Sequence, residues 1–61
     1  MDNVNLFFLD DEKIAKYMID GNILYLKILR GDVTPALEQK IIELISKQEK
    51  KTFTHTAYLN M

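Results

Sequence analysis

Few residues of this sequence have side chains that could carry out a chemical reaction. His55 is the only histidine, there is no cysteine, and the neighbours of the histidine are Thr54 and Thr56. A histidine acts as a catalytic base when a nucleophile and an orienting carboxylate are delivered to it, and no such signature surrounds His55. We therefore expect that the chain is not an enzyme and has no catalytic residue.

The acidic residues do not have the spacing of a metal site. Asp10, Asp11 and Glu12 are consecutive, and Asp20 follows further on. A calcium loop needs alternating oxygen ligands, a central glycine and a glutamate at its twelfth position. One histidine without cysteine also cannot complete a tetrahedral zinc shell. The sequence predicts no metal and no cofactor, and the acidic run is interpreted as the start of a helix, where negative charge is favourable.

The basic residues give a weak indication of nucleic-acid binding. Lys47, Lys50 and Lys51 are clustered, and Phe53 and Tyr58 follow as rings that could stack on bases. However, the chain has eight basic and nine acidic residues, which gives a formal net charge of −1. We expect that nucleic acid is not a partner, and the alternative function is a small DNA-binding regulator of the helix-turn-helix type.

The element that must position any binding surface is an amphipathic helix from Pro35 to about Lys50. Thr34 is a favourable N-cap, and Pro35 suits the first helical position because its missing N–H is not needed there. Apolar residues then recur at i, i+4, i+7 and i+8, with one more at the shoulder of the stripe. These are Leu37, Ile41, Leu44 and Ile45, with Ile42 at the shoulder.

Two shorter helices are predicted ahead of it. Residues 11–20 begin with acidic side chains, and Ile14, Tyr17 and Met18 fall at helical spacing. Residues 22–29 are apolar on nearly every side, and their leucine content favours a helix over a strand.

The alternative for this region is a β-hairpin. Asp20-Gly21 has the composition of a two-residue hairpin turn. That turn would place Met18 opposite Ile23 and Tyr17 opposite Leu24. The helical spacing and the acidic start favour the two helices over the hairpin.

Both ends of the chain are predicted to be extended or irregular. Residues 4–9 form a short apolar segment, which is either a strand or an arm ahead of the first helix. In residues 52–61, threonine alternates with Phe53, His55 and Ala57, a period-two pattern typical of extended chain. The alternatives for this tail are a strand paired with residues 4–9, an arm on a second subunit, or a frayed end.

These elements predict one small domain over residues 1–61. The expected fold is mainly α, with two to three helices and an extended C-terminal tail, and the alternative is α+β with the hairpin around Asp20-Gly21. The chain has no segment approaching the ~20 apolar residues that cross a membrane and no signal-peptide pattern at its start. We therefore expect a soluble, cytoplasmic protein that does not bind membranes.

The expected function is a small protein-protein interaction module that acts through the apolar helix surface. A chain of this length buries only roughly 60% of its unfolded surface, so self-association as a homodimer or docking on a larger protein is expected. Such a module would act as a regulator, inhibitor or adaptor, without a small-molecule substrate. The residues expected to bind the partner are Leu37, Ile41, Ile42, Leu44, Ile45, Tyr17, Tyr25 and Phe53.

Overall fold

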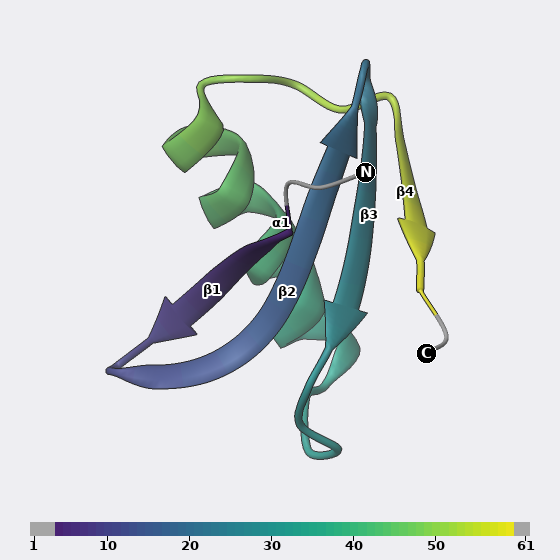
Figure 1. The fold of residues 1–61 in the computed structure, drawn as a ribbon. Helices are drawn as coiled ribbons and strands as arrows, with labels where there is room; N and C mark the ends of the chain where they lie inside the picture. The colour runs from purple at the N-terminus through teal and green to yellow at the C-terminus, as the bar shows by residue number, and fades with distance from the viewer. Residues whose placement is uncertain (1–3, 60–61) are drawn as a thin grey trace.

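A four-stranded sheet with one helix packed against it makes up the structure (Figure 1). The computed structural model describes residues 4–59. The elements follow in the order β1 (Asn5–Leu9), β2 (Glu12–Asp20), β3 (Ile23–Ile28), α1 (Pro35–Glu49) and β4 (His55–Tyr58). The first three strands form an antiparallel meander, and β4 joins β3 in parallel after the crossover through α1.

The prediction of a mainly α fold is wrong, because the chain folds as α+β. The segments predicted as helices over residues 11–20 and 22–29 are the strands β2 and β3. They form a hairpin, although its turn is Gly21-Asn22 and not Asp20-Gly21, since Asp20 pairs with Ile23. Gly21 has a positive φ of 62°, as the first turn position of a type II′ hairpin requires.

The observed register differs by two residues from the hairpin considered above. Tyr17 lies opposite Leu26, and Met18 lies opposite Tyr25. A shift of two residues keeps every side chain on its original face of the sheet. The division of this region into an inner and an outer face therefore does not depend on which turn was chosen.

A β-bulge in β2 explains why this strand resembled a helix. The pairing of β1 with β2 shifts between Phe7 and Phe8, which leaves Ile14 as an extra residue beside Ala15. Ile14 and Ala15 are both buried, and Tyr17 is the next buried residue. The bulge thus places Ile14 and Tyr17, three positions apart, in the same core, as a helix would.

The acidic run forms a turn and not a helix start. Asp10 and Asp11 connect β1 to β2, and their φ angles are 53° and 64°. Two consecutive residues with positive φ characterise a type I′ hairpin turn. Aspartate tolerates this left-handed conformation better than most residues, and glycine adopts it without steric cost.

The predicted long helix is confirmed as α1. The side-chain oxygen of Thr34 accepts a hydrogen bond from the N–H of Leu37 at 3.2 Å, and Pro35 occupies the first turn. The helix ends at Glu49, and Lys50 adopts a left-handed conformation at the C-cap. The N-cap predicted from the sequence therefore fixes the start of this element, and its end lies within one residue of the predicted boundary at about Lys50.

The C-terminal tail is extended, but it pairs with a different strand from the one considered. β4 lies within the predicted tail of residues 52–61, of which residues 60 and 61 fall outside the described range. It pairs with β3, and β1 stands at the opposite edge of the sheet. Pairing of the tail with residues 4–9 is therefore wrong, although residues 5–9 do form a strand.

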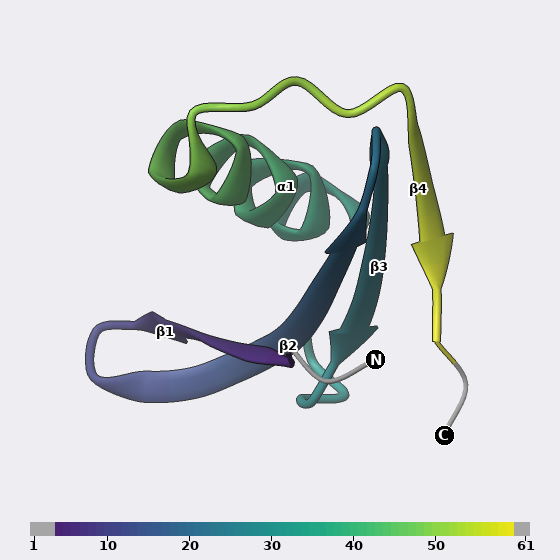
Figure 2. The ribbon, with the colours of Figure 1, turned by 45° about the horizontal axis from the view of Figure 1, so that its top comes forward.

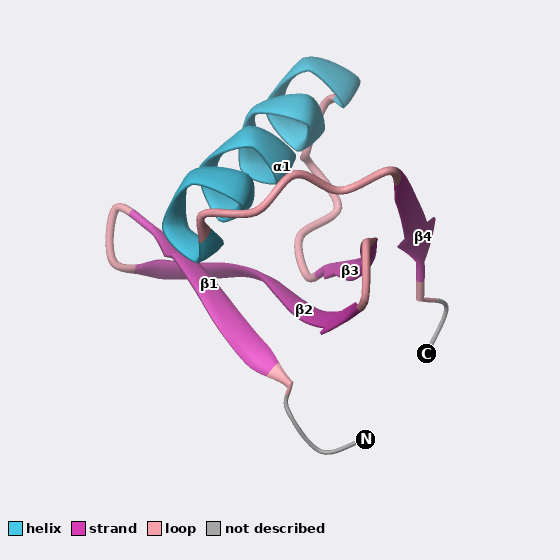
Figure 3. Ribbon diagram, turned by 90° about the horizontal axis from the view of Figure 1, so that it is seen from above, coloured by secondary structure: helices cyan, strands magenta, loops and turns pink. Residues whose placement is uncertain are grey.

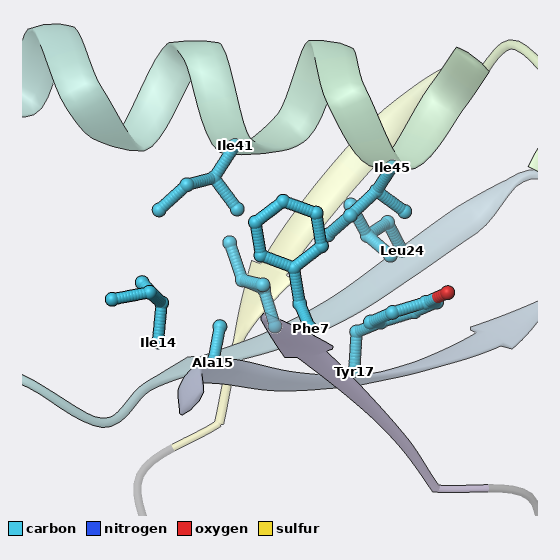
Figure 4. Close-up of a cluster of buried hydrophobic side chains, with 8 residues drawn as sticks. Phe7, Ile14, Ala15, Tyr17, Leu24, Ile41 and Ile45 are labelled. Carbon is cyan, nitrogen blue, oxygen red and sulfur yellow. The ribbon is translucent and has the colours of Figure 1, made fainter. Parts of the chain in front are cut away.

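The core lies between α1 and one face of the sheet. Ile41 and Ile45 point from the helix toward the strands, where they meet Phe7, Leu24 and Tyr17 (Figure 4). Figures 2 and 3 show that α1 lies on one side of the sheet only. The fully or nearly fully buried side chains are Phe7, Ile14, Ala15, Tyr17, Leu24, Leu26, Ile41 and Ile45.

Replacing Asp11 by glycine is expected to stabilise the fold. Asp11 has a φ of 64°, which costs an aspartate roughly 1 kcal/mol that glycine does not incur. Since glycine also loses more entropy on folding, the net gain should be about 0.5 kcal/mol. Urea denaturation of Asp11→Gly followed by circular dichroism measures the change.

The matched control is Asp20→Gly, which places the same substitution at a strand residue that is not among those with positive φ. This variant should lose stability, because glycine weakens a strand. Equal losses of stability in the two variants would show that the turn does not have the conformation described.

Candidate functional site

The surface best placed to bind another molecule is the sheet face opposite α1. We call it the open face. Its side chains alternate along each strand with those of the core, except at the bulge, where Ile14 and Ala15 are both buried. It comprises Leu6, Phe8, Lys13, Lys16, Met18, Asp20, Ile23, Tyr25, Lys27, His55 and Ala57.

Exposed apolar side chains are concentrated at the β1 side of this face. Val4, Leu6 and Phe8 expose 51%, 46% and 53% of their surface, and only Leu29 and Tyr58 among the other large apolar residues described are comparably exposed. β1 contains no charged residue and no proline. Edge strands normally carry such residues to prevent pairing with other chains, so this edge is unusually open to a further strand.

The backbone of β1 also has hydrogen-bonding groups directed off the edge of the sheet. The Leu59 N–H donates to the carbonyl of Leu26 at 2.9 Å, so Leu26 directs its backbone groups toward β4 and away from β2. Tyr17, which lies opposite Leu26, must then direct its own groups toward β1. By the same alternation, the backbone groups of Leu6 and Phe8 point outward, where no described residue pairs with them.

Lysines occupy the middle of the open face. Lys16 and Lys27 are directly opposite each other on β2 and β3, and Leu6 lies on the other side of Lys16. The next row along the strands contains Met18, Tyr25 and Ala57. Like charges directly across a sheet repel each other, so the first row is electrostatically unfavourable without an anion.

A partly buried hydrogen-bond network fastens the end of α1 to β2. The Tyr17 hydroxyl donates to Glu49 Oε2 at 2.6 Å and accepts from Gln48 Nε2 at 3.0 Å. Burial of the phenol, together with the adjacent carboxylate of Glu49, raises the pKa of Tyr17 to about 12. A tyrosine with such a pKa stays protonated at neutral pH, so we assign it a structural role.

The tripeptide Arg30-Gly31-Asp32 forms part of an exposed loop. The Arg30 guanidinium contacts both oxygens of Asp32 and also donates to Glu12 Oε1 at 2.8 Å. The hydrogen bond from Arg30 holds the pKa of Asp32 below its usual value. Gly31 does not end a helix, since β3 precedes this loop.

His55 lies at the exposed start of β4. Its Nδ1 is 3.2 Å from Thr54 Oγ1, the hydroxyl of its own chain neighbour. Within the described part of the chain, no three residues of the types that bind metals lie close enough together to hold an ion.

The structure separates the residues that were predicted to bind a partner. Ile41 and Ile45 are fully buried against the sheet, and Tyr17 exposes only 1% of its surface. These three belong to the core. They cannot also form a docking surface while the domain is folded as described.

The other predicted residues lie at the margin of the core or outside it. Four of them are partly buried and pack against the core, namely Leu37, Ile42, Leu44 and Phe53. Tyr25 alone lies on the open face. Leu6, Phe8 and Lys16 also lie on the open face but were not predicted from the sequence. A period-two pattern over β1 and β2 would have placed them beside Tyr25.

The lysine cluster near the end of α1 does not have the aromatic neighbours that its sequence suggests. Phe53 packs against the core, and the Tyr58 hydroxyl donates to Glu38 Oε1 at 3.0 Å. The three lysines of this cluster are exposed, namely Lys47, Lys50 and Lys51. Stacking of bases on Phe53 is therefore not supported by the geometry.

Comparison with known proteins gives no relative from which a function could be carried over. The chain matches no family model, no curated protein and no solved structure. Among the described residues, no helix has the length and apolar character needed to cross a membrane. The open face and the edge of β1 are the features of the molecule from which a function can be inferred.

Tyr17 should titrate later than an ordinary tyrosine, near pH 12. Because the folded pKa lies above the unfolded value of about 10, the contribution of this group to stability is complete below pH 10 and is lost as the pH rises toward 12. A pKa difference of this size between the folded and unfolded states corresponds to about 2–3 kcal/mol in the free energy of unfolding. Tyrosinate absorbance and urea denaturation across this pH range measure the two effects.

The comparison is between Tyr17→Phe and Tyr25→Phe. Burial and the adjacent Glu38 also raise the pKa of Tyr58, so this residue keeps a late step in both variants. Tyr17→Phe should lose one late-titrating tyrosine and reduce the alkaline loss of stability, whereas Tyr25→Phe should leave both unchanged. An undiminished late absorbance change in Tyr17→Phe would contradict the assignment.

Proposed function

We propose that this chain is a protein-interaction module that associates with itself by adding β1 of one copy to β1 of another. The observation that carries the proposal is that β1 exposes apolar side chains along the same edge as backbone groups with which no residue in 4–59 pairs. Pairing at this edge would extend the four-stranded sheet across both copies. In this proposal the module works by binding and not by catalysis.

The two outward-facing residues of β1 suit an antiparallel pair with twofold symmetry. If Phe7 lies on the symmetry axis, Leu6 of each copy is opposite Phe8 of the other. The backbone groups of both residues point off the edge, so each pair would exchange two hydrogen bonds. Their side chains would also meet on the open face, as cross-strand apolar neighbours.

The distribution of charge is compatible with such a pair. The antiparallel arrangement places the Asp10-Asp11 turns of the two copies at opposite ends of the new contact. Lys13 and Lys16 stand one strand further in, so two intervening strands separate them from the same lysines of the other copy. Three strand spacings amount to about 14 Å, which exceeds the screening length of physiological salt.

The proposal moves the binding surface from the helix to the sheet. The helix residues Ile41 and Ile45 are buried, whereas Leu6 and Phe8 are exposed. A helix-turn-helix function is not proposed, because α1 is the single helix in residues 4–59 and that motif needs two.

The same edge would accept a strand from a larger protein. Addition of an extended segment to an exposed sheet edge is a recurring mode of protein recognition. Self-pairing and capture of such a partner would then compete for one site, as suits a small regulator, inhibitor or adaptor. We place the protein in the cytoplasm, since the absence of cysteine fits a reducing compartment.

Replacing Leu6 by lysine is expected to convert the homodimer to monomer. The change puts a charge at the middle of the proposed contact and removes an apolar side chain that is 46% exposed. The dissociation constant should rise at least about tenfold, since each 1.4 kcal/mol corresponds to that factor. Molar mass by sedimentation equilibrium across a dilution series measures it.

Leu29→Lys is the matched control, because Leu29 is 38% exposed but lies outside β1. This variant should dimerise as the unmodified chain does. A monomeric unmodified chain at every concentration would refute self-association, and equal weakening by the two variants would refute its location at β1.

A further inference from the structure

We propose that the open face binds single-stranded nucleic acid, with Lys16 and Lys27 contacting phosphates and Tyr25 stacking on a base. The site comprises the two central strands and does not require the pairing of β1 described above. It is a second binding function, for a ligand of different chemistry.

The open face carries a local excess of positive charge. Lys13, Lys16 and Lys27 lie on it, although the whole chain carries a net charge of −1. With Asp20 included the face carries +2, so the rest of the chain carries −3, that is, −1 minus +2. The single acidic residue of the open face is Asp20, four residues along β2 from Lys16, or about 13 Å.

The placement of two lysines opposite each other is the strongest indication of an anionic ligand. Lys16 and Lys27 are direct partners in the β2–β3 register. Like charges at directly opposite positions destabilise a sheet. Among residues 4–59, the ion pairs between side chains involve Arg30 and not these lysines. A phosphate placed between the two ammonium groups would convert their repulsion into attraction.

Aromatic side chains lie beside the lysines. Tyr25 is two residues from Lys27 on β3, so both side chains are on the same face about 7 Å apart. Phe8 is directly opposite Lys13 in the β1–β2 register and is 53% exposed. Tyr25 is partly buried, so part of its ring remains accessible. A basic surface that also carries aromatic rings is the combination that binds single strands, because the rings stack on bases while the lysines contact the backbone.

Other occupants fit this face less well. A second copy stacked face to face would bring Lys16 and Lys27 against the same lysines of its partner. An acidic peptide would satisfy the charges but would make no use of the rings of Tyr25 and Phe8. A duplex presents its bases edge-on and leaves few of them free to stack. Single-stranded nucleic acid satisfies both features.

The net charge predicted the opposite, that nucleic acid would not be a partner. That expectation was based on the net charge of the whole chain and on the basic residues of the predicted helix. The hairpin register brings together two lysines that are eleven positions apart in the sequence. The local charge of the open face, and not the total, decides which ligand it can bind.

Fluorescence anisotropy of a labelled oligothymidylate, titrated with the full chain, tests the proposal. Binding should weaken as salt rises from about 50 to 200 mM. If Lys13 adds a third phosphate contact to those of Lys16 and Lys27, the slope of log K against log salt should be near −2. Lys16→Gln combined with Lys27→Gln should reduce this slope by more than half. Tyr25→Leu should weaken binding roughly tenfold while leaving the slope unchanged.

Lys40→Gln combined with Lys47→Gln is the matched control, since it removes the same charge from exposed positions on α1. Circular dichroism of every variant should show an intact fold. Replacing Lys16 and Lys27 should not lower stability, because it removes a like-charge pair.

Several results would overturn the proposal. The first two are the absence of binding at the lowest salt and equal weakening of binding by the open-face pair and the control pair of substitutions. The other two are binding of a duplex of the same length, or of a polyglutamate peptide, with the same affinity as the single-stranded oligonucleotide. An unchanged affinity in Tyr25→Leu would exclude the stacking contact.

Discussion

The packing of α1 against one face of the sheet is the interaction on which the rest of the structure depends. Ile41 and Ile45 fill the space above Leu24, Phe7 and Tyr17, and no side chain of this core is polar apart from the Tyr17 hydroxyl. Burial of such residues is the main favourable term in folding. One helix covers only one face of a sheet, so the same packing that holds the fold together leaves the opposite face open.

Two exposed features follow from this arrangement, and they differ in position and in chemical character. The edge of β1 faces sideways and is apolar, whereas the open face is basic at its centre. Pairing of two copies at β1 would leave both open faces accessible and place them side by side. The proposed partner strand pairs with the backbone of β1, whereas the proposed nucleic acid lies over Lys16, Lys27 and Tyr25 on the two central strands. Leu6 and Phe8 lie at the boundary between the two sites.

The sequence was sufficient to place α1 but not the strands. Thr34, Pro35 and the apolar stripe are local signals that act within one helix, so no other part of the chain was needed to interpret them. β2 was misread because the bulge at Ile14 interrupts its period-two pattern. β3 was misread because Ile23 and Tyr25 make its open face apolar as well.

The candidate site was hidden for the same reason. Whether a residue of β2 faces the core or the open face depends on pairing with strands on both sides, which no local pattern specifies. Tyr17 and Tyr25 are both tyrosines in similar sequence surroundings. Tyr17 is nevertheless buried in the core, whereas Tyr25 lies outside it. The opposition of Lys16 and Lys27 exists only once the hairpin register is known.

Amide hydrogen exchange at Leu6 and Phe8, measured by NMR as a function of protein concentration, tests the central claim most directly. These two N–H groups point off the β1 edge, whereas those of Asn5 and Phe7 point toward β2. Pairing of β1 with a second copy predicts that exchange at Leu6 and Phe8 slows as concentration rises, while exchange at Asn5 and Phe7 changes little. Fast exchange at Leu6 and Phe8 at every concentration would contradict the claim that this edge is where the protein binds.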